Sequence, residues 1–140
     1  MRAFIDTNVI VDVVAKREPF FADSQLILAL CATGDLEGVV SDLTFCNVAY
    51  VLRKSLGSTQ LRDGLRVLKN HLTIVPIGEV AITAALEREA TDFEDAVQLE
   101  AARANQVDVI ITRNVRHFND SSIRVCTPSE LLSEDPEQSL

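Results

Sequence analysis

Short apolar runs alternate along the chain with longer segments in which apolar residues recur at helical spacing. The apolar runs predict five strands, at residues 3–5, 38–40, 72–76, 107–111 and 123–126. The segments between them predict helices at 9–15, 22–32, 42–54, 58–68, 79–90 and 92–104, and a short last helix from residue 128. Strands that alternate with helices form βαβ units, so the pattern predicts an α/β fold whose parallel sheet is covered by helices on both faces. In such sheets, ligands bind beyond the carboxyl ends of the strands.

The composition is typical of one globular domain. The chain has 140 residues, of which 47% are hydrophobic, and no apolar run approaches the roughly 18 residues of a membrane-spanning helix. We expect the domain to cover residues 1–132 and an acidic, flexible tail to occupy 133–140. Three widely spaced cysteines, Cys31, Cys46 and Cys126, have apolar neighbours, so we expect reduced, buried thiols and a cytoplasmic protein.

The formal net charge of −8 at pH 7 argues against simple nucleic-acid binding. A function on nucleic acid would need a local basic rim, or metal ions that invert the charge at an acidic site. A metal-dependent nuclease therefore stays compatible with the composition.

Asp6 directly follows the first predicted strand, where a carboxylate points into the crevice that binds ligands. The structural alternative is that Asp6 caps the next helix. Thr7 and Asn8 follow it and can cap that helix instead, which would free Asp6 for another role. The position alone leaves both interpretations open.

A second group of acids lies at residues 91–95. Thr91 and Glu94 fit the capping-box pattern, which predicts a structural role for Glu94. Asp92 and Asp95 are three residues apart and therefore share one helix face, where like charges repel. The helix dipole explains Asp92 at the helix start, whereas a bound divalent cation explains Asp95 better.

The end of the fourth strand carries the densest basic cluster of the chain, Arg113, Arg116 and His117. Such a cluster beside a strand end suits phosphate contacts with a nucleic-acid backbone. Thr112 and Asn114 offer uncharged oxygens at the same place. Alternatively, Asn114 is a turn residue and His117 an exposed loop histidine.

Asn47 lies inside the helix predicted at 42–54, at the border of its apolar stripe. Asparagine is a poor residue for a helix interior, and a buried one needs hydrogen-bond partners. It either bonds within the core or faces the acidic crevice.

Taken together, these segments resemble the PIN domain family, in particular a bacterial branch with DFEDA and TRN segments. The resemblance rests on residues 4–10, 92–96, 111–114 and 127–132, which span nearly the whole chain in the family's order. It implies a three-layer α/β/α sandwich with a central parallel sheet of five strands, in which the first and fourth strands are neighbours. Asp6 and Asn114 would then lie side by side, with Asp95 facing them.

The resemblance also implies a Mg²⁺- or Mn²⁺-dependent ribonuclease, such as the VapC-type toxins that pair with an antitoxin protein and often form homodimers. The chain departs from the usual family acids at three positions, which are Asn47, Asn114 and His117 here. Fewer anionic ligands predict weaker Mg²⁺ binding.

The resulting hypothesis is metal-assisted hydrolysis of RNA phosphodiester bonds. Asp6 and Asp95 would hold the ion, with Asp92 reaching it directly or through water. Asn114 would orient the attacking water or a phosphate oxygen, and Asn8, Asn47 and Thr112 would support the site. The phosphate contacts would come from Arg113, Arg116 and His117.

Two alternatives belong to other classes. The neutral residues Asn47 and Asn114 favour a catalytically weak or inactive PIN module that binds RNA or a protein partner. A phosphatase of the haloacid-dehalogenase type also begins with an Asp after the first strand, but it needs a second acid where this chain has Asn8.

Overall fold

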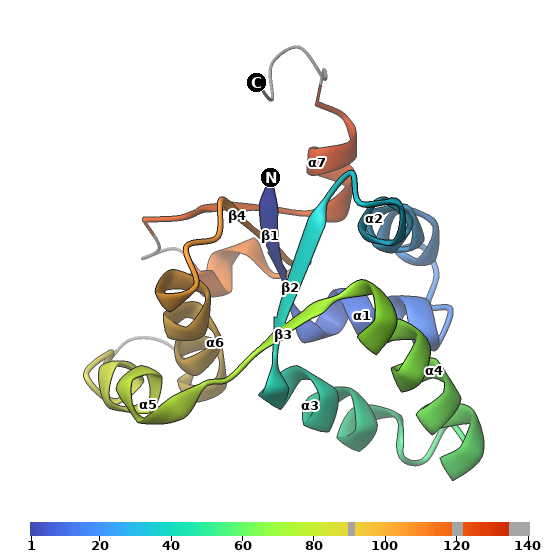
Figure 1. Cartoon of the computed structure of the whole chain (residues 1–140), viewed down its shortest axis with the longest axis horizontal. Coiled ribbons are helices and arrows are strands. Elements are labelled where there is room, and N and C mark those ends of the chain that lie inside the picture. Colours follow the sequence, from blue (N-terminus) through green and yellow to red (C-terminus); the bar gives the residue numbers. More distant parts are fainter. Residues whose placement is uncertain (90–91, 119–121, 135–140) are drawn as a thin grey trace.

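The computed structural model describes residues 1–89, 92–118 and 122–134. A five-stranded sheet lies at its centre, in the order β3-β2-β1-β4-β5, and all neighbouring strands are parallel (Figure 1). The strands are β1 (Arg2–Ile5), β2 (Glu37–Ser41), β3 (Thr73–Val75), β4 (Val109–Ile111) and β5 (Arg124–Cys126). All five predicted strands are confirmed, and β1 and β4 are neighbours as the family resemblance implies.

Helices cover both faces of this sheet. The described residues form α1 (Thr7–Val14), α2 (Phe21–Thr33), α3 (Asp42–Leu52), α4 (Ser58–His71), α5 (Gly78–Leu86), α6 (Phe93–Ala104) and α7 (Pro128–Leu132). A short 3₁₀ helix, η1 (Val115–Phe118), follows β4. Figure 1 shows α5 and α6 on one side of the sheet and α1 to α4 on the other. The fold is the predicted three-layer α/β/α arrangement with a parallel sheet.

Side chains of β1 alternate between two apolar clusters, because successive residues of a strand point to opposite faces. Ala3 and Ile5 pack in the larger cluster with α1, α2 and α3, whereas Phe4 packs with α6 and β4 on the other face. All three side chains are fully buried. This double burial fixes β1 in the middle of the sheet, so that its carboxyl end opens between the two helical layers.

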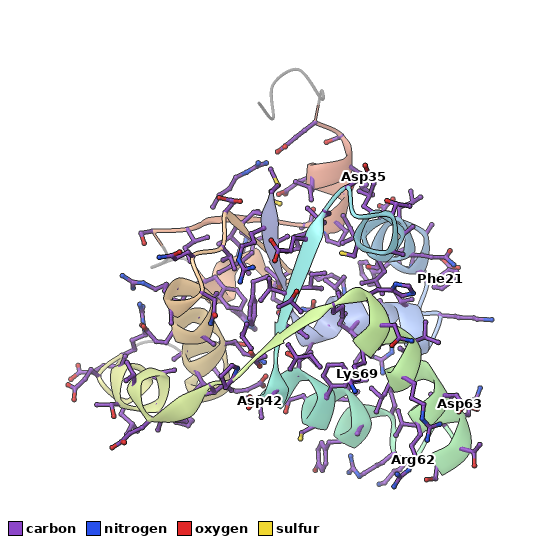
Figure 2. All side chains as sticks on the ribbon, in the orientation of Figure 1. Phe21, Asp35, Asp42, Arg62, Asp63 and Lys69 are labelled. Carbon is purple, nitrogen blue, oxygen red and sulfur yellow. The ribbon has the colours of Figure 1, made fainter. Side chains whose placement is uncertain are left out.

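The outer face of α4 carries charged side chains. Figure 2 shows Arg62 and Asp63 projecting from the side of α4 that faces away from the sheet. Arg66 pairs with Asp63 one turn away, at 2.8 Å. No helix among the described residues has the length and apolar character needed to cross a membrane.

Residues with distinct capping preferences mark several helix ends. Gly34 ends α2 with φ +85°, the left-handed conformation that glycine tolerates best. Thr127 caps α7 in a capping box with Glu130. Ser41 caps α3 by accepting a hydrogen bond from the Thr44 N–H group.

Other boundaries differ from the prediction. The helix predicted at 42–54 ends at Leu52, and the one predicted at 79–90 spans Gly78–Leu86. In both, the predicted helix extends over charged residues that lie beyond the last helical turn, and periodicity alone does not mark the true end. Gly57 immediately precedes α4 as its N-cap residue.

The cysteine prediction is partly wrong. Cys31, Cys46 and Cys126 are all free thiols, and Cys31 and Cys126 are buried as expected. Burial raises the pKa of the Cys31 thiol to about 11. Cys46 is exposed, because its position on α3 points away from the sheet-facing residues Thr44 and Val48.

The predicted tail lies mostly outside the described residues, which end at residue 134. Its first two residues are bonded to the domain. The Ser133 hydroxyl donates to the carbonyl of Glu130, and Glu134 pairs with Arg124 of β5.

Candidate functional site

Asp6 lies where β1 ends and α1 begins. Its N–H group donates to the carbonyl of Ile111, the last residue of β4. Oδ1 accepts a hydrogen bond from the Thr7 N–H group at 2.8 Å, and Oδ2 accepts one from the Thr112 hydroxyl at 2.7 Å. Only 7% of the residue is exposed. Burial raises the pKa of Asp6, and these two hydrogen bonds partly offset it.

The expectation that Thr7 or Asn8 caps α1 is wrong, because both lie within the helix. Asp6 has the extended backbone of an N-cap residue, and its side chain accepts from the first helical N–H group. The two interpretations of Asp6 are therefore compatible. One carboxylate oxygen serves the helix start, while the other contacts the segment that follows β4.

Asp92 caps α6, and Oδ1 accepts a hydrogen bond from the Asp95 N–H group at 3.3 Å. This contradicts the predicted capping box, in which Glu94 was the third helical residue. The helix begins one residue later than that pattern requires, so Asp95 takes this position. Thr91, the predicted cap, lies outside the described residues. Glu94 is consequently not engaged in capping, and its carboxylate is available at the site.

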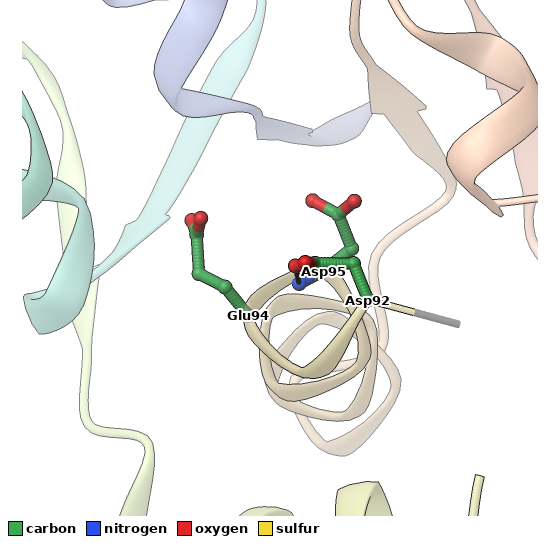
Figure 3. Close-up of side chains that lie close together, drawn as sticks. All are labelled: Asp92, Glu94 and Asp95. Carbon is green, nitrogen blue, oxygen red and sulfur yellow. Dashed lines mark hydrogen bonds between the residues drawn. The ribbon is translucent and has the colours of Figure 1, made fainter. Parts of the chain in front are cut away.

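Three carboxylates gather over the first turn of α6, as Figure 3 shows for Asp92, Glu94 and Asp95. One oxygen from each lies within 4.8 Å of the others, a spacing at which they can ligate a single metal ion. Sequence reasoning identified Asp92 and Asp95 but assigned Glu94 a structural role. The available signal was the DFED segment itself, which places all three acids on one helical turn.

The charge of Asp6 affects the pKa values of two acids in this cluster. Burial, the negative charge of Asp6 and that of Asp92 raise the pKa of Asp95, although His117 counteracts them. Burial and the charges of Asp95, Asp6 and Asp92 likewise raise the pKa of Glu94. Asp6 thus acts on both acids across the gap between β1 and α6. Glu94 and Asp95 are therefore repelled by Asp6 as well as by Asp92.

Asn47 faces these acids. Its side-chain amide donates to Glu94 Oε1 at 2.7 Å, which connects α3 to α6. This settles the alternative left open by the sequence, since Asn47 bonds to the acidic crevice and not within the core. Gln98, one turn beyond Glu94, is fully buried and accepts a hydrogen bond from the Ser41 hydroxyl at 2.7 Å.

Thr112 and Asn8 hold the segment that follows β4. Thr112 is fully buried, and its hydroxyl oxygen accepts from the Asn114 N–H group at 3.0 Å while donating to Asp6. Asn8 donates to the same oxygen at 3.4 Å and accepts from the Arg113 N–H group at 3.3 Å. Asn114 itself is exposed. These contacts are consistent with the supporting roles predicted for Asn8 and Thr112.

The three predicted basic residues are placed differently. Arg113 turns into the protein and binds the fully buried carboxylate of Asp12 with two guanidinium nitrogens, Nε and Nη2. Its guanidinium also stacks on Phe20, 4.2 Å from the ring centre. Arg116 is exposed, and His117 Nδ1 lies 3.0 Å from Asp95 Oδ2. Arg113 is therefore occupied by a structural ion pair, whereas His117 lies beside Asp95 and Arg116 is exposed on the same 3₁₀ helix.

The donor set fits a small divalent cation. Hard carboxylate oxygens are the preferred ligands of Mg²⁺ and Mn²⁺. Desolvated carboxylates that raise one another's pKa are stabilised by a positive ion between them. Asp6, Asp92, Glu94 and Asp95 would hold such an ion.

Residues 2–116 match the family model described as "PIN domain". No curated protein matches the chain. Among solved structures, a chain of the DNA-bound VapBC complex from Salmonella typhimurium is similar, with a TM-score of 0.69, 17% identity, and 91% of this chain and 98% of that chain covered. A chain of a toxin–antitoxin complex from Klebsiella pneumoniae has a TM-score of 0.67 and 22% identity over 90% and 97% of the two chains. VapC20 from Mycobacterium tuberculosis, a sarcin-ricin loop cleaving toxin, has a TM-score of 0.62 and 15% identity over 77% and 86%.

Proposed function

Because the chain belongs to the PIN domain family, we propose that it is a Mg²⁺- or Mn²⁺-dependent endoribonuclease that hydrolyses RNA phosphodiester bonds. One observation carries the proposal. The negative charge of Asp6, at the end of β1, acts on Glu94 and Asp95, two of the three carboxylates that cluster at the start of α6. This edge of a parallel sheet is where α/β proteins bind ligands.

The four acids would hold the ion. When bound, a divalent ion supplies a water of lowered pKa and neutralises the charge that builds up on the phosphate oxygens. The hydrogen bond from the Thr112 hydroxyl fixes the direction of Asp6, and the cap interaction fixes that of Asp92. No covalent nucleophile from the protein is required.

The basic residues beside the acids would position the RNA. Arg116 is exposed on η1 and suits a phosphate contact, which orients a strand without reading its bases. His117 hydrogen-bonds Asp95 through Nδ1 and leaves its second ring nitrogen for a phosphate oxygen. Asn114 is exposed and would orient the attacking water or a non-bridging oxygen.

We also propose the biological setting. The similar solved structures include a toxin–antitoxin complex, a DNA-bound VapBC and a sarcin-ricin loop cleaving toxin, so this chain would be the toxin of a toxin–antitoxin pair. It would act in the cytoplasm as a homodimer and be inhibited by a protein antitoxin. Residues 1–132 would form the PIN domain, and 133–140 a tail.

Cleavage of a labelled single-stranded RNA tests the activity. We expect cleavage with Mn²⁺, loss of cleavage with excess EDTA, and loss in Asp6→Asn, which preserves the side-chain shape while removing a ligand charge. Asn70→Asp changes an exposed residue of α4 and serves as the surface control. Equal cleavage by the unchanged chain and Asp6→Asn, or cleavage that persists in EDTA, would refute the proposal.

A second candidate is a PIN module that binds RNA or protein without cleaving it. The neutral, exposed Asn114 favours this alternative, since it contributes no charge to the ion. Calorimetry with Mn²⁺ separates the two. A folded chain that binds no Mn²⁺ at millimolar concentration supports the binding module, whereas saturable binding that is lost in Asp95→Asn supports the enzyme.

A further inference from the structure

We infer that Asn47 is a positioning residue, whose side-chain amide holds the Glu94 carboxylate in the direction needed to ligate the divalent ion. The inference rests on the proposed function, because it assigns a role within that same site. It also changes the interpretation of the asparagine at position 47. The residue is a working hydrogen-bond donor of the site and not a position where an acid has simply been lost.

The contact itself is short and joins two elements. Asn47 Nδ2 lies 2.7 Å from Glu94 Oε1, and the two residues are 47 positions apart in the chain. Hydrogen bonds with one charged partner are shorter and about twice as strong as those between neutral groups. Asn47 is half-buried on α3, whereas Glu94 and the hydrogen bond itself are exposed to solvent.

A second amide acts on Glu94 from its own helix. Gln98 is fully buried, and a hydrogen bond from its side chain lowers the pKa of Glu94. Gln98 is in turn fixed by α3, since its Oε1 accepts from the Ser41 hydroxyl and its Nε2 lies 3.4 Å from the Thr44 hydroxyl. Residues of α3 and its N-cap therefore reach Glu94 both directly, through Asn47, and indirectly, through Gln98.

The chemistry of these donors matters. A Lys or Arg at position 47 would orient Glu94 but cancel its charge. A neutral amide orients the carboxylate and leaves its full negative charge for a cation. The remaining forces on Glu94 oppose its ionisation, because Asp95, Asp6 and Asp92 repel it. An uncharged donor is thus the group that fixes a metal-binding carboxylate without competing with the metal.

This geometry predicts the behaviour of Asn47→Leu, which has nearly the same shape but no donor. The Kd for Mn²⁺, measured by electron paramagnetic resonance of the free ion, should rise about tenfold, the lower end of the effect of losing a hydrogen bond to a charged group. Asn47→Gln keeps the amide on a longer arm and should recover part of this loss. Asn70→Leu on the exposed face of α4 is the control and should leave the Kd unchanged.

A double-mutant cycle separates positioning from a general structural effect. In a Glu94→Gln background, Asn47→Leu should cause no further rise of the Kd, because the residue acts through the Glu94 carboxylate. An equal rise in both backgrounds would mean that Asn47 supports the fold and would overturn the inference. So would an unchanged Kd in Asn47→Leu alone.

A metal-free measurement tests the contact directly. The side-chain amide signals of Asn47, identified by their absence in Asn47→Leu, should move in the nitrogen–proton NMR spectrum of Glu94→Gln. Signals that do not move would overturn the inference whatever the enzyme does. A chain that binds Mn²⁺ with the predicted cycle but cleaves no RNA would refute the proposed function and leave the role of Asn47 standing.

Discussion

Replacing Arg113 by Leu should strongly lower the melting temperature, Tm, of the protein in the absence of RNA. The guanidinium binds Asp12, whose side chain is completely buried within α1. Leu keeps apolar contact with Phe20 but leaves the Asp12 carboxylate without its counter-charge. The sequence pattern places Arg113 among phosphate-binding residues, so this variant distinguishes the two roles.

The magnitude follows from the burial of Asp12. Removing one partner of a buried ion pair costs about 3–5 kcal/mol, because the other charge stays buried and unpaired. Loss of the stacking of Arg113 on Phe20 adds about 0.5–1 kcal/mol. A domain of this size is stable by only about 5–15 kcal/mol, so the variant loses a large fraction of its stability. At roughly 3–4 °C per kcal/mol, Tm should fall by about 10–20 °C.

Thermal unfolding followed by circular dichroism measures this change, with Arg116→Leu as the matched control. Arg116 is exposed three residues away, so its replacement should alter the free energy of unfolding by less than about 0.5 kcal/mol. The double variant Asp12→Leu with Arg113→Leu should recover most of the loss, because no unpaired charge remains. Equal, small changes of Tm in Arg113→Leu and Arg116→Leu would refute the reasoning.

Three further predictions concern the site. Arg116→Ala should raise KM for RNA more than it lowers kcat. It should also reduce the slope of log KM against log salt concentration by about one, because one phosphate contact is lost, and a salt series on the variant and the unchanged chain measures this. Asn114→Asp adds a charged oxygen at a position predicted to lie beside Asp6, so its Kd for Mn²⁺ should fall, and an unchanged Kd in calorimetry would place Asn114 away from the ion. The pKa of Asp95 is raised from 3.8, so its ionisation disfavours the native state, and the free energy of unfolding falls as the pH rises above that value. In EDTA at pH 7, Asp95→Asn should therefore have a higher Tm than the unchanged chain, and a lower Tm would contradict this sign.

Much of the fold is predictable from local pattern. The first strand could be placed because its apolar run stops abruptly at Asp6, and the parallel sheet followed from the alternation of strands and helices. Helix ends were predictable where a residue has a distinct conformational preference, as Gly34 and Thr127 have. Ends without such a residue, as after Leu52, were placed too late.

A site residue was predictable from the sequence only where its place at a strand end or a helix start indicated its role. Asp6 and Asp95 stood out because they follow a strand end and lie within a helix start. Glu94 is missed because Thr91 and Glu94 have the spacing of a capping box, a pattern that predicts a helix starting one residue earlier than α6 does. With Asp92 as the N-cap residue, Glu94 has no capping role.

The sequence could not identify which residues from distant segments pair with one another. The pairing of Arg113 with Asp12 joins residues 101 positions apart, and no local pattern indicates which acid an arginine binds. The amide of Asn47 likewise finds Glu94 only after α3 and α6 have packed against the sheet.

The central claim is that Asp6 and the acids of α6 hold the divalent ion that hydrolysis requires. Anomalous diffraction at the manganese edge, from crystals grown with Mn²⁺, tests it most directly. We expect a peak between Asp6 and Asp95, within coordination distance of their carboxylate oxygens and with Asp92 or Glu94 bound directly or through water. A well-occupied manganese peak elsewhere, with this cluster empty, would contradict the claim.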